Sequence, residues 1–284
     1  MRTRFTLFVL LILASSSLQA QELYLRLQGS LTTPATSGIV EVSQITDSTG
    51  YTRQHNVVTT LGGGLLFGID AGYQFSENFA AELGFQYLAS NRILAKETIV
   101  PSLIIAAHTY TRMGQATLGI ALNTGGTGLR GFTRMGALLP IFGATFIEAK
   151  FILSPPFTPS NTLSKTRNDG KFSIGWYGGM GVEYPLGDKI RISAEVSFNY
   201  LRVKTNTQTI LERKDLNTGE DLTANLTTSE REIIYLDEIN SNSNNRELNS
   251  GNFDIDKPEE LLAYTSNYSN AGLRIGIAFS LFKK

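Results

Sequence analysis

The residue types that could carry acid, base or nucleophilic chemistry are few in this sequence. It has no cysteine, which excludes disulfides, thiolate metal sites and thiol catalysis, and its only two histidines are His55 and His108. Ser102 and Glu97 stand close to His108, and a histidine beside a hydroxyl and a carboxylate can activate that hydroxyl as a nucleophile. Because the spacing fixes no geometry, we interpret His108 as a solvated histidine and keep catalysis as the weaker alternative. The sequence predicts no cofactor and no metal site.

A second set of ionisable residues occurs singly, on strand faces that are rich in small residues. Asp70, for example, stands between Gly68 and Gly72 in an alternating segment. Glycine weakens an ordinary strand, so its repetition indicates a face confined in a narrow space where bulky side chains do not fit. Charges in such a space need partners, and we interpret them as structural pairs rather than as a proton relay or a transport path. The expected interior set is Asp70, Glu82, Glu183, Arg191, Glu195 and Arg274.

The segments that carry these charges are apolar on their other face. Apolar residues occupy alternate positions in residues 65–75 and again in residues 79–89, and only Ser76-Glu77-Asn78 separates the two runs. Alternation with a period of two predicts β-strands, and the short polar turn predicts a hairpin. The same pattern predicts eight strands in all, near residues 21–30, 65–75, 79–89, 104–122, 129–147, 172–184, 190–200 and 271–281.

Single residues predict two details of strand pairing. Two alternation phases compete around Pro140, which cannot donate to a ladder, so we expect a bulge in the fifth strand. Glu183 is expected to face Arg191 across the ladder of the sixth and seventh strands. That register pairs Tyr184 with Ile190.

The connections between these strands alternate between long and short. An even number of strands joined in this way is typical of outer-membrane β-barrels, with long outer loops, tight periplasmic turns and both termini in the periplasm. The expected long loops are residues 31–62, 91–102, 152–170 and 204–262. Within them, we expect a hairpin arm at 39–45, a hairpin at 210–223 and a helical turn at 258–264. Ten strands would result if a hairpin within a loop joined the wall.

The first 20 residues are expected to be an export signal rather than part of the fold. Arg2 and Arg4 precede a short apolar run, and small residues lead to Ala20, which matches the charged, apolar and small-residue regions of a signal peptide. Without these residues the chain has 23 basic and 25 acidic side chains, a net charge of −2. That balance argues against a nucleic-acid partner.

The strand lengths and strand number together predict a filled transmembrane barrel. Eight steps from Phe79 to Tyr87 cover roughly 27 Å along a strand, or about 20 Å when the strand is tilted, close to the ~25 Å apolar band of an outer-membrane barrel. Eight strands enclose just enough room for their own side chains. We therefore expect an all-β, eight-stranded antiparallel up-and-down transmembrane β-barrel over residues 21–284.

At this point the chain resembles the small eight-stranded outer-membrane proteins, the group of the OmpA transmembrane domain and OmpX, and the broad outer membrane protein beta-barrel domain family. The closing strand is similar to the C-terminal insertion signal that such proteins offer to the barrel-assembly machinery, at Leu273, Ile275, Ile277, Phe279, Leu281 and Phe282. The resemblance implies an integral protein of the bacterial outer membrane, in contact with lipid and lipopolysaccharide.

The distribution of charge suggests where a role would lie. Residues 204–262 carry 13 acidic and 6 basic side chains, a net charge of −7. We expect a non-enzymatic protein with a structural or surface-recognition role through acidic outer loops, since function concentrates on long loops. A solvated loop bridged to lipopolysaccharide by divalent cations explains the same charge. The alternatives are a narrow, porin-like channel and a lipid A-modifying barrel enzyme, for which His108 is the weak catalytic candidate.

Overall fold

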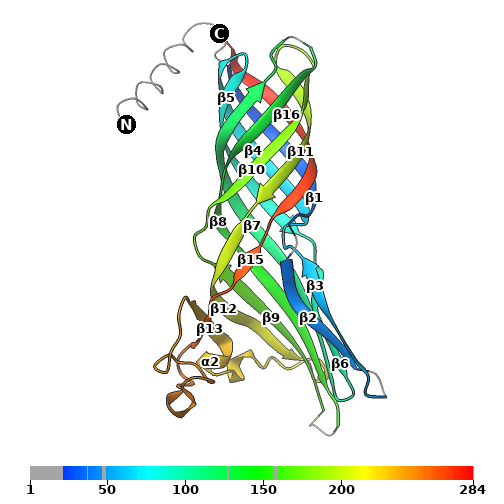
Figure 1. The fold of residues 1–284 in the computed structure, drawn as a ribbon, viewed down its shortest axis with the longest axis vertical. Coiled ribbons are helices and arrows are strands. Elements are labelled where there is room, and N and C mark those ends of the chain that lie inside the picture. Colours follow the sequence, from blue (N-terminus) through cyan, green and yellow to red (C-terminus); the bar gives the residue numbers. More distant parts are fainter. Residues whose placement is uncertain (1–21, 37, 47–48, 127, 156–158, 284) are drawn as a thin grey trace.

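A closed ring of eight antiparallel strands forms half of the molecule (Figure 1). The computed structural model describes residues 22–36, 38–46, 49–126, 128–155 and 159–283, so the expected signal peptide lies outside the described residues. Each strand of the ring pairs with the next, and the last returns to the first. The ring consists of β1 (Glu22–Pro34), β4 (Gly64–Ser76), β5 (Phe79–Ser90), β7 (Leu103–Asn123), β8 (Arg130–Leu153), β10 (Gly175–Pro185), β11 (Ile190–Tyr200) and β16 (Asn270–Lys283). The expected eight-stranded up-and-down topology is confirmed.

The short turns and the ends of the described chain lie together at one end of the ring. Glu22 pairs with Lys283 there, and tight turns join β4 to β5, β7 to β8 and β10 to β11. The β10–β11 turn shifts the register that the sequence predicted. Tyr184 pairs with Ile192 rather than Ile190, because residues 186–189 form the turn and Leu186 N–H donates to the carbonyl of Ile190. A shift of two residues keeps every side chain on its face.

The outer face of the ring is a belt of exposed apolar side chains. Burial alternates strictly along β4, where Leu65, Phe67 and Ile69 are exposed and the residues between them are covered or partly covered. The same holds for β11, whose residues Ile192 and Val196 are exposed. Apolar groups in such a continuous belt need lipid rather than water around them. The expected apolar face is therefore the outside of the ring.

Glycine on the inner face of β4 makes room for an aromatic ring from β1. A Cβ placed on Gly72 would lie 2.1 Å from Cζ of Tyr24. We expect Gly72→Leu to displace this ring and to lower the free energy of unfolding by ~1–3 kcal/mol, since overpacking forces side chains and backbone to shift. Urea unfolding in lipid vesicles measures the loss. Ala71→Leu, at the next position on the lipid face, is the matched control and should change stability little.

β7 and β8 are 21 and 24 residues long and continue far beyond the ring as the centre of an outer sheet (Figure 1). On one side β6 (Ile93–Val100), β2 (Gly38–Thr46) and β3 (Thr52–Thr59) extend this sheet. On the other side it continues through β9 (Ser160–Gly170), β12 (Arg202–Asp215), β13 (Glu232–Leu236) and β14 (Glu259–Leu262), and β15 (Thr265–Asn267) pairs with β12. Among the described residues, no strand of the outer sheet is inserted into the ring, so the wall of the ring consists of eight strands.

Several segments that were expected to be loops are strands of this outer sheet. Residues 91–102 hold β6, residues 152–170 hold β9, and β12 occupies the start of residues 204–262. The hairpin arm expected at residues 39–45 is present as β2 and β3. The helical turn expected at 258–264 is wrong, because those residues form β14, which pairs in parallel with β13. Backbone pairing with a neighbour decides these assignments, since none of the segments has the alternating apolar face of a barrel strand.

The bulge expected near Pro140 lies where β8 changes partners. Gly114 pairs with Phe142 but Gln115 pairs with Pro140, so Ile141 is an extra residue. β8 pairs with β10 up to Leu138 and with β9 from Thr145, so Pro140, which has no N–H to donate, lies between the two ladders. The extra residue switches the alternation phase of β8, which explains the two competing phases.

Residues 204–262, called the acidic segment below, contain little sheet after β12 and form short turns instead. They include the 3-10 turns Thr223–Asn225 and Ser250–Asn252 and the one-turn helix α2 (Thr228–Arg231), whose N-cap Thr227 forms a capping box with Glu230. Residues 213–222 form the expected hairpin tip, with Asp215 N–H donating to the carbonyl of Glu220 at 2.9 Å. Within the described residues, no helix has the length and apolar character needed to cross a membrane.

Candidate functional site: the barrel interior and its outer end

Arg134 on β8 is the centre of a buried ion-pair network inside the ring. Its guanidinium lies 3.0 Å from Oδ2 of Asp70 on β4 and 3.4 Å from Oε2 of Glu82 on β5. It also pairs with Glu195 on β11 and donates at 2.9 Å to the side-chain oxygen of Gln28. One cation therefore links four strands through three carboxylates, and its own side chain is 1% exposed.

The network continues toward the end with the short turns. Arg26 on β1 donates at 2.7 Å to Glu82, which also accepts from the hydroxyl of Tyr24 at 2.6 Å. Glu183 on β10 is shared by three arginines, at 3.4 Å from Arg26, 3.0 Å from Nε of Arg191, and in contact with Arg130. Arg191 also forms an ion pair with Glu22, which pairs with Lys283 at the end of the β1–β16 ladder.

The structure places all six residues of the expected interior set inside the ring, and each takes part in the network. Glu183 and Arg191 meet diagonally rather than directly across the ladder, because of the register shift in β10 and β11. Four further members of the network were not in the expected set: Glu22, Arg26, Arg130 and Arg134. With them the interior holds five arginines and five carboxylates, so it is balanced in formal charge.

Arg274 on β16 is the least well satisfied member of the network. Its nearest carboxylate is that of Glu195, at 3.6 Å, and none of its three side-chain nitrogens has a hydrogen-bond partner among the described residues. The side chain is 2% exposed. A buried polar group in this state is a place for an ordered water molecule.

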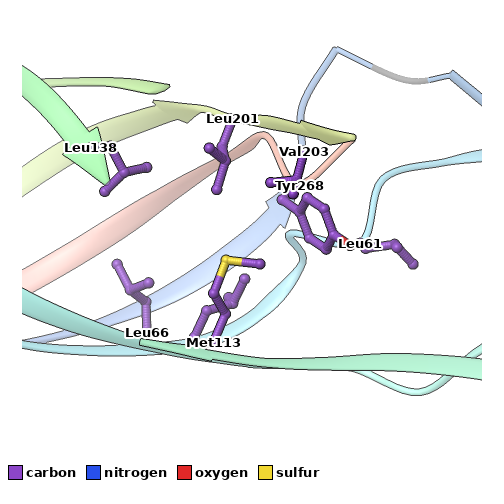
Figure 2. Close-up of a cluster of buried hydrophobic side chains, with 8 residues drawn as sticks. Leu61, Leu66, Met113, Leu138, Leu201, Val203 and Tyr268 are labelled. Carbon is purple, nitrogen blue, oxygen red and sulfur yellow. The ribbon is translucent and has the colours of Figure 1, made fainter. Parts of the chain in front are cut away.

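An apolar cluster closes the outer end of the ring above the charged network (Figure 2). Leu66, Leu88 and Leu138 are buried side chains of β4, β5 and β8. Figure 2 shows Tyr268 and Leu61 approaching each other at one side of the cluster. The full cluster is Leu61, Leu66, Leu88, Met113, Leu138, Leu201, Val203 and Tyr268. The cluster therefore adds an apolar layer to the interior beyond the ion pairs.

Two segments hold the cluster across the mouth of the ring. Residues 59–64 and 267–270 run side by side, with Leu61 N–H donating to the carbonyl of Asn267 at 2.9 Å and the Thr60 hydroxyl donating to that of Ser269 at 2.7 Å. A Cβ on Gly62 would lie 2.2 Å from the carbonyl oxygen of Tyr268. Glycine is therefore required for this close approach.

His108 lies on the outer face of β7, above the ring, and the trio considered from the sequence is not assembled there. His108 pairs across the ladder with Glu148, whose carboxylate lies 2.8 Å from Arg92. Ser102 is at the turn between β6 and β7, six residues along the strand, which is roughly 20 Å away. Glu97 pairs with Ala106 on the same ladder. Among the described residues, no group of three or more metal-ligating side chains could hold an ion.

Asp237 ties the acidic segment to the outer sheet. Its carboxylate accepts from Nζ of Lys171 at 2.8 Å and lies 2.9 Å from Nζ of Lys204. These two ammonium groups lower the pKa of Asp237 to about 2. The ion pairs should therefore persist as the pH falls from neutral and be lost only as it approaches 2, through the lowered pKa.

Removing this carboxylate tests whether it fixes the segment. In Asp237→Asn we expect faster amide hydrogen exchange in β13 and β14, because the amide cannot form the two ion pairs. Hydrogen exchange read by mass spectrometry at neutral pH measures the change. The control is Glu238→Gln at the next, exposed position, which should leave exchange unchanged. Equal protection in both variants would contradict the role of Asp237.

The apolar residues of the closing strand face away from the interior. Leu273, Ile275, Leu281 and Phe282 are among the most exposed apolar side chains of the ring. Ile277 and Phe279 lie on the same face between them and pair with Leu27 and Leu25 of β1. Leu281 and Phe282 are both exposed because a register shift in the β1–β16 ladder falls beside them. The proposed insertion signal is thus one continuous lipid-facing row.

A family model and solved structures of outer-membrane proteins are similar to this chain. The family model described as "Outer membrane protein beta-barrel domain" matches residues 5–228. Neisserial surface protein A is 12% identical over 93% of this chain and 100% of that one, with a TM-score of 0.37. A major outer membrane protein from Thermus thermophilus is 11% identical over 92% and 98%, with a TM-score of 0.38. Ail, the attachment invasion locus protein of Yersinia pestis, solved with the heparin analogue sucrose octasulfate, is 11% identical over 92% and 100%, with a TM-score of 0.30. No curated protein matches the chain.

Proposed function

Because the chain belongs to the outer membrane protein beta-barrel domain family, and so to the bacterial outer membrane, we propose that it is a closed barrel with a surface-recognition role outside the cell. The observation that carries this proposal is the contrast between the two halves of the molecule. Inside the ring, ion pairs and an apolar cluster fill the space. Beyond it, β7 and β8 continue into a sheet that spanning the membrane does not require.

We propose the orientation of the barrel from the same contrast. With the short turns and both termini in the periplasm, the outer sheet and the acidic segment lie outside the cell, where a partner can reach them. In this orientation the lipid-facing row of β16 is the signal presented to the barrel-assembly machinery. Trypsin treatment of intact cells tests the topology, because Arg231 and Arg246 are exposed and lie within residues 204–262. Cleavage there supports it, and cleavage only after the outer membrane is opened contradicts it.

The acidic segment is the part of this surface best suited to a partner, and its charge favours a basic one. Poly-lysine is the probe, with the full-length protein in nanodiscs. Binding should weaken with added salt and fall several-fold when three exposed acids are neutralised together, by Glu238→Gln, Glu247→Gln and Asp256→Asn. Neutralising Glu77, at the opposite end of the barrel, is the control. Binding that survives the triple variant would contradict recognition through this segment.

The alternatives predict different measurements. A narrow channel predicts discrete conductance in planar bilayers that changes with Glu195→Ala or Arg274→Ala. A silent bilayer supports the closed barrel, and steady conductance overturns it. A lipid A-modifying enzyme predicts that His108→Ala abolishes a change in lipid A composition while the barrel still folds. We propose that the protein is not an enzyme, so we expect the same lipid A composition in cells with the wild-type protein and in cells with His108→Ala.

A further inference from the structure

A cavity of about 870 Å³ lies in the outer sheet, directly above the apolar cluster. Its floor is formed by Leu61, Val203 and Tyr268, which belong to that cluster, and its walls come from β6, β7, β8, β9 and β12. This volume is in the range of pockets that bind small organic molecules. Because the cluster separates the cavity from the barrel interior, a molecule bound here would be held at the cell surface rather than passed through the ring.

A second opening of about 380 Å³ lies beside this cavity, toward the lipid-facing side of the barrel. It lies at the bulge of β8, where that strand has left β10 and has not yet reached β9. The exposed apolar side chains of Ile141, Phe142 and Phe172 line its outer side, and Met113 and Tyr268 line its inner side. The two spaces share six lining residues: Thr145, Asn168, Asp169, Gly170, Val203 and Tyr268. The two spaces are therefore adjacent, and these six residues lie between the edge of the lipid belt and the cavity.

The walls of the cavity combine an apolar surface with one unsatisfied polar group. Ile105, Ala107, Ile147, Ala149 and Phe151 provide the apolar surface. Asn168 is 7% exposed, and its side-chain oxygen has no hydrogen-bond partner among the described residues, while its Nδ2 donates to the Tyr264 hydroxyl at 3.2 Å. A hydroxyl can donate as well as accept, so rotation of the amide would present an N–H group to the cavity instead. A bound polar headgroup would satisfy this residue.

The charge around both openings is positive. Arg167 pairs with Asp169 at 2.8 Å, and Asp237 is shared by Lys171 and Lys204, so two carboxylates compensate part of the charge. Four cationic side chains lie along the two spaces beside these carboxylates: Arg167, Lys171, Arg202 and Lys204. Four cations against two carboxylates favour an anionic group on the ligand.

We propose that this cavity binds a single-chain anionic amphiphile, of the chemistry of a long-chain fatty acid, which enters from the outer leaflet through the opening beside the bulge of β8. The apolar chain lies against the walls formed by β7 and β8. The anionic head lies near Asn168 and the cationic side chains. The cavity shares only Lys204, Thr205 and Gln208, at the start of β12, with residues 204–262. None of the three acids neutralised in the poly-lysine experiment lines it, so its test is independent of the recognition proposed above.

Photo-crosslinking with a diazirine-bearing palmitate analogue tests occupancy of the cavity. The full-length protein is folded into vesicles containing the probe, illuminated, and its labelled peptides are identified by mass spectrometry. We expect labels on β7 and β8 within residues 103–113 and 144–153, and at least a tenfold loss of these labels in Ala107→Trp, which fills the cavity. Ala106→Trp is the matched control, because Ala106 is the adjacent residue on the outer face of β7. Heat-dependent gel mobility verifies that both variants fold. Equal labelling of Ala107→Trp and Ala106→Trp overturns the proposal. Labelling of the wild-type protein by the matching fatty alcohol as strong as that by the palmitate probe also overturns it.

A second arm distinguishes entry from the membrane from entry out of solution. Ala144 is buried and lines the opening, so Ala144→Trp should slow labelling by membrane-embedded probe at least tenfold. Labelling by probe added briefly to the water outside should change little. The control is Ala137→Trp on the lipid-facing wall, beside Trp176 in the ladder. If membrane-embedded probe labels the Ala144→Trp cavity at the normal rate, the proposed route is wrong.

Discussion

Replacing Arg134 by methionine should lower the free energy of unfolding by about 3–5 kcal/mol, the cost of removing one partner from a buried ion pair. Arg134 is the only residue that contacts Asp70, Glu82 and Glu195 together within the described part of the chain. Glu82 would keep Arg26, and Asp70 would keep only the amide of Gln28, at 2.8 Å. The excess negative charge would therefore remain inside the ring without a close cation. Urea unfolding in lipid vesicles measures the loss.

A charge-balanced double variant separates lost charge from lost packing. Arg134→Met combined with Asp70→Asn removes one charge of each sign. We expect this double variant to lose less unfolding free energy than Arg134→Met alone, and less than the sum of the losses of the two single variants. Arg92→Met is the control for a surface arginine, because its pair with Glu148 is half exposed and should be worth ~0–1 kcal/mol. If Arg134→Met cost no more than Arg92→Met, the interior would be hydrated rather than packed.

The wall of the barrel was predictable because lipid imposes a strict pattern on it. Every outward residue of β4 must be compatible with lipid and every inward residue must fit a narrow space, so Ile69 and Gly72 each carry information about their face. The tight turn at Glu77 fixed the pairing of β4 with β5. The turn after β10 was less informative, because a turn of this length allows more than one register, and Tyr184 pairs two residues away from its expected partner.

The outer sheet was not predictable in the same way because neither of its faces is uniformly apolar. In β9, Thr162, Ser164 and Thr166 alternate with Leu163, Lys165 and Arg167, and such a sequence reads as a polar loop. Its strand conformation comes from pairing on both sides, with the preceding strand β8 and with β12, which is distant in sequence. Pairing of this kind is set by neighbours rather than by local composition.

The interior site was partly predictable for a related reason. Arg191 and Arg274 lie on strands with one clean alternation and could be assigned to the inner face from the sequence. Arg134 could not, because the extra residue Ile141 reverses the phase of β8 and leaves both faces plausible. Arg26 alternates with Leu25 and Leu27, so its inward position was visible, but a single arginine near the chain start gave no sign of its partners. Only the closed ring brings Arg26 to Glu82 and Glu183.

Replacing Ile69 by arginine should cost ~2–4 kcal/mol, the cost of a cation near the midplane of a lipid-facing barrel wall. Ile69 is near the middle of β4, 40% exposed, and lies between Leu27 and Phe85 on the ladders. Ala106→Arg is the depth control: Ala106 lies on the outer face of β7 beyond the ring, where an arginine reaches water and should cost little. Urea unfolding in vesicles gives both values. Because this cost depends on lipid rather than on neighbouring side chains, equal losses in the two variants would place the apolar belt elsewhere on the molecule.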